Sequence, residues 1–85
     1  MAEEKIIGKI IHYYGKINVG IIELADELKV GDKIHIKGSA TDFEQTVDSM
    51  QVEHQDIEQA KIGDSIGLKL SNKAKEGDQV FKVSE

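Results

Sequence analysis

The chain has 85 residues, a length that suits one domain with a modest core, and we treat residues 1–85 as a single domain. It contains no cysteine, which excludes disulfides and cysteine-ligated metal sites. Sixteen acidic residues stand against eleven basic ones, all lysine, so the net charge of -5 at pH 7 disfavours independent binding of RNA or DNA.

Short segments with alternating apolar residues follow one another along the chain, and β-branched residues are frequent in them. Glycine, asparagine and aspartate separate these segments, as they do in turns. The expected strands are 6–14, 17–24, 33–38, 43–53, 65–70 and 79–83. Only 23–29 and 55–61 have a helical pattern, each of about two turns at most. The pattern predicts an all-β protein, a small antiparallel β-barrel of about six strands with short helical turns.

The expected core follows from the alternation along these strands. In the segment 43–53, Phe43 and Val47 share one face, whereas Met50 and Val52 have the opposite parity. A bulge near residues 48–49 would return the later pair to the core side. The predicted core is Ile10, Val19, Ile21, Ile34, Ile36, Val47, Met50, Ile66, Leu68 and Val80.

A Gly-Asp pair precedes three of the expected strands. Glycine adopts the positive φ of a tight turn without steric cost, and aspartate hydrogen-bonds nearby backbone. We interpret the pairs as structural turns that start strands, not as a phosphate-binding loop. They are Gly31-Asp32, Gly63-Asp64 and Gly77-Asp78.

Histidines and carboxylates give no clear catalytic or metal-binding pattern. His12 and His35 alternate with apolar neighbours on outward strand positions, and His54 is expected in a loop or before a helix. Two imidazoles without a cysteine or a well-spaced carboxylate make a poor zinc site. We therefore predict no metal and no cofactor.

Acidic residues alternate along one expected strand, at Asp42, Glu44 and Asp48. Paired acids perform acid–base chemistry only when a cleft desolvates them, and a barrel of this size has little room for one. Asp26, Glu27 and Asp32 lie elsewhere. We interpret all of these carboxylates as solvated and predict that the protein is not an enzyme.

The segment HYYGKIN at 12–18 has chemistry that a binding surface could use. Adjacent strand residues point to opposite faces, so one of its two tyrosines should be exposed. An exposed tyrosine beside lysines can stack on a base or anchor a protein partner, whereas the alternative is that both tyrosines cover the barrel. The candidate binding residues are Lys9, His12, Tyr13, Tyr14 and Lys16.

Five motifs occur in the order found in the second domain of elongation factor Tu. They are GKI (8–10), LKVGDKIHIKG (28–38), TVDSMQVE (46–53), AKIGDSIGLKL (60–70) and KEGDQVF (75–81). The resemblance covers residues 7–83 and implies the barrel common to reductases, isomerases and elongation factors. The run YYGKINVGIIEL (13–24) resembles the C-terminal domain of collagenase-like peptidases more closely.

The chain departs from the elongation-factor pattern in two ways. It has no G-x-x-x-x-G-K-[ST] loop, so we expect no GTP binding and a free-standing domain without a GTPase domain. Little sequence precedes Gly8, and Ser65 stands where the family has an asparagine near the pocket for the tRNA end. The resemblance therefore does not extend to that pocket.

The resemblance implies a non-catalytic binding module that docks on a protein or ribonucleoprotein partner linked to translation. The alternatives are an accessory domain acting in trans with an enzyme such as a collagenase-like peptidase, or a weak direct RNA binder. With no long apolar run, we expect a cytoplasmic protein without membrane contact. A barrel that lacks its first strand would expose a sheet edge, which predicts a homodimer or an added partner strand there.

Overall fold

The computed structural model describes residues 3–53 and 55–84, and the described residues form ten antiparallel strands. This confirms the all-β class. The strands are β1 (Glu3–Tyr14), β2 (Val19–Leu24), β3 (Leu28–Lys29), β4 (Lys33–Lys37), β5 (Asp42–Thr46), β6 (Met50–Val52), β7 (Gln55–Ile57), β8 (Gln59–Ala60), β9 (Ser65–Lys69) and β10 (Gln79–Ser84). His54, expected in a loop or before a helix, lies outside the described residues.

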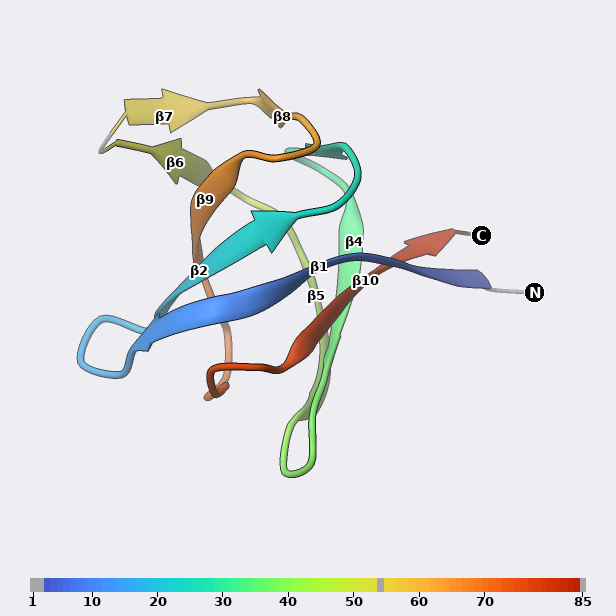
Figure 1. The fold of residues 1–85 in the computed structure, drawn as a ribbon, viewed down its shortest axis with the longest axis vertical. Helices are drawn as coiled ribbons and strands as arrows, with labels where there is room; N and C mark the ends of the chain where they lie inside the picture. Colours follow the sequence, from blue (N-terminus) through green and yellow to red (C-terminus); the bar gives the residue numbers. More distant parts are fainter. Residues whose placement is uncertain (1–2, 54, 85) are drawn as a thin grey trace.

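Eight of the strands form one coiled sheet, and β3 pairs with β8 in a small second sheet (Figure 1). The order in the large sheet is β5-β4-β10-β1-β2-β9-β6-β7. Its two ends, β5 and β7, do not pair with each other among the described strands. The expected closed or nearly closed barrel is therefore wrong, because the sheet curls but remains open.

The expected single bent strand at 43–53 is in fact two strands. β5 lies at one edge of the sheet and β6 lies next to the other edge, so residues 47–49 carry the chain from one end to the other. Gln45 spans part of the remaining gap with its side-chain amide. Its Nε2 donates to the carbonyl of Lys69 (2.9 Å), and its Oε1 accepts from the amide of Ser71 (2.7 Å).

The first strand lies inside the sheet, not at an edge. β1 pairs with β10 on one side and β2 on the other, and a register shift interrupts each ladder. The shifts lie between Ile6 and Gly8 and between Ile10 and His12. Such bulges bend a strand and increase its twist. The exposed edge expected beside Gly8–Ile10 is therefore absent, and dimer formation remains a prediction.

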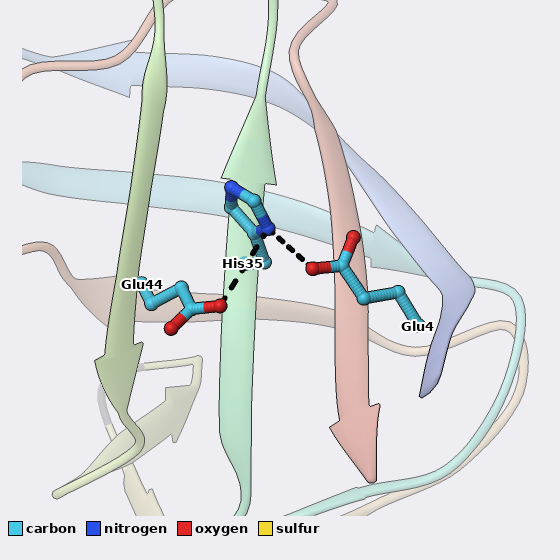
Figure 2. A group of neighbouring side chains, drawn as sticks. All are labelled: Glu4, His35 and Glu44. Carbon is cyan, nitrogen blue, oxygen red and sulfur yellow. Dashed lines mark hydrogen bonds and ion pairs between the residues drawn. The ribbon is translucent and has the colours of Figure 1, made fainter. Parts of the chain in front are cut away.

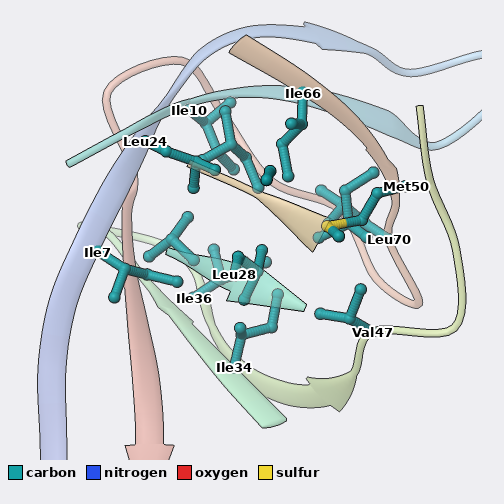
Figure 3. Packing of buried hydrophobic residues seen from close by; sticks show 14 of the residues in the cluster. Ile7, Ile10, Leu24, Leu28, Ile34, Ile36, Val47, Met50, Ile66 and Leu70 are labelled. Atoms are coloured by element: carbon teal, nitrogen blue, oxygen red, sulfur yellow. The ribbon is translucent and has the colours of Figure 1, made fainter. Parts of the chain in front are cut away.

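The core lies inside the curl of the sheet, where mainly isoleucine and leucine pack together (Figure 3). Val19 and Ile21 were expected there but are only half-buried, whereas Ile22 and Leu24 are buried. In the segment 20–24 (GIIEL), Ile21 points to one face of the strand and Ile22 and Leu24 point to the other, so alternation alone does not determine which face points inward. The other eight predicted core residues are buried.

The two helical turns expected at 23–29 and 55–61 are also wrong. These segments hold the end of β2 and the short strands β3, β7 and β8. Isolated helices of two turns are marginal in water, and buried Leu28 instead pairs with Ala60 across the small sheet. Within residues 3–53 and 55–84, no helix could cross a membrane.

The three Gly-Asp pairs share one geometry. Gly31, Gly63 and Gly77 have φ values of 99°, 90° and 90°, in the left-handed region that favours glycine. In each pair the aspartate Oδ2 accepts from the amide three residues before it, at 2.9, 3.0 and 2.8 Å. The carboxylate therefore closes the turn that precedes the strand.

Candidate functional site

The β1–β2 hairpin presents its two tyrosines to opposite faces of the sheet. Tyr13 is half-buried against the core, and its hydroxyl donates to Asn18 Oδ1 (3.0 Å). Tyr14 is exposed. Asn18 closes the turn with a φ of 53°, a conformation that asparagine tolerates. One tyrosine thus secures the hairpin, and the other is free to contact a partner.

The second bulge in β1 places His12 and Tyr14 together on the outer face. Their ring centroids lie 4.7 Å apart in an edge-to-face arrangement. His12 Nδ1 also lies 3.4 Å from Glu76 Oε1 on the neighbouring surface. The pairing register puts His12 opposite Ile21 and Tyr14 opposite Val19. The half-buried residues that were expected in the core therefore extend an apolar outer face.

An open groove of about 430 Å³ lies on this face, and we call it the Gly67 groove. Apolar side chains dominate its lining, and Glu53 and Ser65 add polar groups. Ile17, at the hairpin tip, is 59% exposed. The full lining is Tyr14, Ile17, Val19, Ile21, Gln51, Glu53, Ser65 and Gly67.

Gly67 leaves room in the groove because it has no side chain. It pairs with Ile21 on one side and Gln51 on the other. A Cβ built at Gly67 would lie 3.6 Å from Ile21 Cδ1, 3.7 Å from the Gln51 carbonyl oxygen and 3.8 Å from Val19 Cγ1, all ordinary contacts. A larger residue would therefore fit the backbone and fill part of the groove.

The sequence identified this region only in part. Of its five candidates, Tyr14 lines the Gly67 groove and His12 stacks on Tyr14. Lys16 is exposed in the hairpin turn, and Lys9 lines a separate hollow of about 250 Å³. Sequence reasoning did not place Val19, Ile21 or Gly67 on the surface. For β2, the presence of apolar residues at both odd and even positions could have indicated that both faces of the strand are apolar.

A second group of side chains gathers on the outer face near the start of β1 (Figure 2). His35 from β4 lies between Glu4 of β1 and Glu44 of β5, and we call these three residues with Asp42 the His35 cluster. His35 Nδ1 is 2.6 Å from Glu4 Oε2 and 3.8 Å from Glu44 Oε2. Its Nε2 hydrogen-bonds to Asp42. The His35 side chain is only 12% exposed.

Lysines pair with the remaining oxygens of the two glutamates. Lys37 Nζ lies 2.9 Å from Glu4 Oε1 and 5.3 Å from the centroid of the Phe81 ring. Lys33 Nζ lies 3.4 Å from Glu44 Oε1. Each glutamate therefore presents one oxygen to a lysine and the other to the imidazole.

These contacts shift the acidities of the cluster. Hydrogen bonds to Glu4 and then Asp42 raise the pKa of the His35 imidazole. The same bond to His35, followed by that to Lys37, lowers the pKa of Glu4. Pairing with Glu4 raises the pKa of Lys37. His35, Asp42 and Glu44 were expected to be separate solvated groups, but strand pairing brings them together with Glu4.

The curated proteins that the chain resembles are named as a protease and as collagenases. No family model matches the chain. Over 80 residues, or 93% of this chain, it is 44% identical to an uncharacterized protease of Methanocaldococcus jannaschii, of which it covers 20%. It is also 29% identical over 85 residues to a collagenase of Porphyromonas gingivalis, covering 98% of this chain and 24% of that protein. A collagenase of Porphyromonas gingivalis strain W83 is 31% identical over 81 residues, which cover 93% of this chain and 20% of that protein.

The fold has a close counterpart among solved structures. The C-terminal domain of a U32 peptidase from Geobacillus thermoleovorans superposes with a TM-score of 0.84 and 14% identity, covering 89% of each chain. At this identity the likeness concerns the fold alone. The chain spans about a fifth to a quarter of the length of the curated relatives it matches.

These comparisons correct the functional expectation drawn from elongation factors. The relatives are a protease and collagenases, so they support the collagenase-like resemblance and not a link to translation. The motifs that suggested elongation factor Tu contain Gly-Asp turns and alternating strands, which shape the fold and do not form a functional site. A fold that many functions share does not identify one of them.

Proposed function

We propose that this chain is a non-catalytic accessory module of a collagenase-like peptidase, carried on the same polypeptide or acting in trans. The observation that carries the proposal is the 44% identity to a protease over 93% of the chain. Because the match covers only 20% of that protease, the chain corresponds to one segment of a larger enzyme. The fold likeness to the C-terminal domain of a U32 peptidase supports the same role.

The Gly67 groove is the surface that we assign to contact with the peptidase. Its lining is mainly aliphatic and aromatic, with amide, hydroxyl and carboxylate groups at Gln51, Ser65 and Glu53. Tyrosine beside exposed aliphatic side chains is typical of protein interfaces, where a few such anchors supply most of the binding energy. These groups suit recognition of a protein surface better than cleavage of a bond.

Affinity capture from extracts of the source cells tests the proposal. The 85-residue chain is immobilised, and the retained proteins are identified by mass spectrometry. We expect a collagenase-like peptidase to be retained by the unchanged chain and lost with Gly67→Val. This substitution fills part of the groove and introduces a residue that favours strands.

Thr46→Val is the matched control, because it introduces the same side chain at an exposed position of β5, away from the groove. It should retain the peptidase as the unchanged chain does. Capture of collagen or gelatin without the peptidase would instead make the module a substrate binder. Equal capture by Gly67→Val and Thr46→Val would show that the groove does not contact the peptidase.

A further inference from the structure

We propose that Glu4, His35 and Glu44 form a binding site for a divalent transition-metal ion such as Zn²⁺. Each offers one ligand atom, and these three atoms all lie within 4.8 Å of one another. One imidazole nitrogen with two carboxylate oxygens is a ligand set that zinc accepts. Three protein ligands would leave a fourth position for water.

The spacing of the ligand atoms is close to what such an ion requires. Tetrahedral zinc with ligands at about 2.0–2.1 Å places neighbouring ligand atoms about 3.3 Å apart. His35 Nδ1 lies 2.6 Å from Glu4 Oε2 and 3.8 Å from Glu44 Oε2. These two distances lie on either side of that value, so rotations of the two glutamate side chains would bring the ligand atoms to the spacing that the ion requires.

Partners beyond the ligands already orient them. Asp42 binds Nε2 of His35, which directs Nδ1 toward the two glutamates as in carboxylate–histidine–zinc sites. Lys37 and Lys33 contact the Oε1 atoms of the glutamates, leaving both Oε2 atoms directed at the imidazole. The lysines thus hold the carboxylates without occupying the oxygens that the ion would take.

The ligands come from three strands, β1, β4 and β5, and Glu4 lies 31 residues before His35 in the chain. None of the three strands pairs with both of the others, since β10 separates β1 from β4. A bound ion would therefore link three strands across one end of the sheet. Metal that binds only the folded state raises its stability by mass action.

Calorimetric titration of the metal-stripped 85-residue chain with ZnCl₂ tests this proposal. We expect one Zn²⁺ per chain, and loss of that binding in His35→Gln and in Glu44→Gln. Asp42→Ala removes an orienting partner and should weaken binding about 10- to 100-fold. Mg²⁺ should bind far more weakly, because it prefers oxygen ligands to imidazole.

His12→Gln is the matched control, because His12 also lies near an acid, Glu76, but outside the His35 cluster. It should bind Zn²⁺ as the unchanged chain does. Thermal melts give a second readout: Zn²⁺ should raise the melting temperature of the unchanged chain and of His12→Gln, but not of the two ligand variants. Absence of Zn²⁺ binding, undiminished binding in both ligand variants, or equal affinity for Mg²⁺ would overturn the proposal.

Discussion

The two ends of β1 lie in outer-face regions of opposite character. Near its start, Glu4 joins His35 and Glu44 in a cluster whose polar groups are paired with one another. Near its end, Tyr14 borders the Gly67 groove, where apolar side chains surround a hollow. The strand is continuous, and each region lies on the same sheet.

The two regions differ in whether their side chains find partners within the chain. Ion pairs and hydrogen bonds in the His35 cluster meet the needs of its polar atoms within the chain. The apolar side chains of the Gly67 groove remain in contact with water, and burying them against another protein would be favourable. We therefore place the protein partner at the groove, whereas an ion at the cluster would have to replace the contacts of His35 with Glu4 and Glu44.

Truncating side chains on the two faces of β2 should give the largest difference. Ile22→Ala empties a fully buried site and should lower the free energy of unfolding by about 2–5 kcal/mol. Ile21→Ala removes a half-buried groove side chain and should lower it by roughly 1 kcal/mol. Urea denaturation of both variants measures the difference. A larger loss in Ile21→Ala than in Ile22→Ala would mean that β2 has the opposite face inward.

Replacing each of two glycines by alanine should change the free energy of unfolding by smaller amounts, and the two changes should differ in sign. A Cβ at Gly8 would lie 2.5 Å from the carbonyl oxygen of Glu23, so Gly8→Ala should destabilise the protein by about 1–3 kcal/mol. Gly67→Ala meets only ordinary contacts and should leave stability unchanged or raise it by up to about 1 kcal/mol. A clear loss in Gly67→Ala would show that the groove floor is already filled.

Replacing His35 or His12 by glutamine tests whether the contacts of the His35 cluster stabilise the protein. In metal-free protein, His35→Gln should lower the melting temperature, because it leaves Glu4 and Asp42 without their shared partner. His12→Gln should change it little, since the His12 side chain is 52% exposed and makes one surface pair. The loss in His35→Gln should still be smaller than that in Ile22→Ala. A larger effect from His12 would contradict the assignment.

Much of the fold could be predicted from local pattern. Alternation located the segments of the main strands, and Gly31, Gly63 and Gly77 occupy the positive-φ positions of three turns. Sheet closure could not be predicted, because it depends on how far the curl brings β5 toward β7. The inward face of β2 was missed because Ile21 and Ile22 give both parities an apolar residue.

The candidate sites were less accessible from sequence because they depend on pairing between distant segments. Glu4 lies 31 residues before His35, whereas His35 and Glu44 pair directly on the consecutive strands β4 and β5, and the order β5-β4-β10-β1 brings all three together. The groove depends on Gly67 lying between Ile21 and Gln51, which alternation within one strand does not reveal. Adjacent strand residues point to opposite faces, so one ring of the tyrosine pair was expected to be exposed, but the sequence did not determine that it is Tyr14.

Hydrogen exchange with and without the collagenase-like peptidase of the source cells tests the central claim most directly. We expect binding to slow exchange at the end of β1, in β2 and in β9, where the Gly67 groove lies. Exchange in β4 and β5, which carry His35 and Glu44, should be unchanged. No change anywhere, or slowed exchange confined to β4 and β5, would contradict the account of an accessory module that docks through the groove.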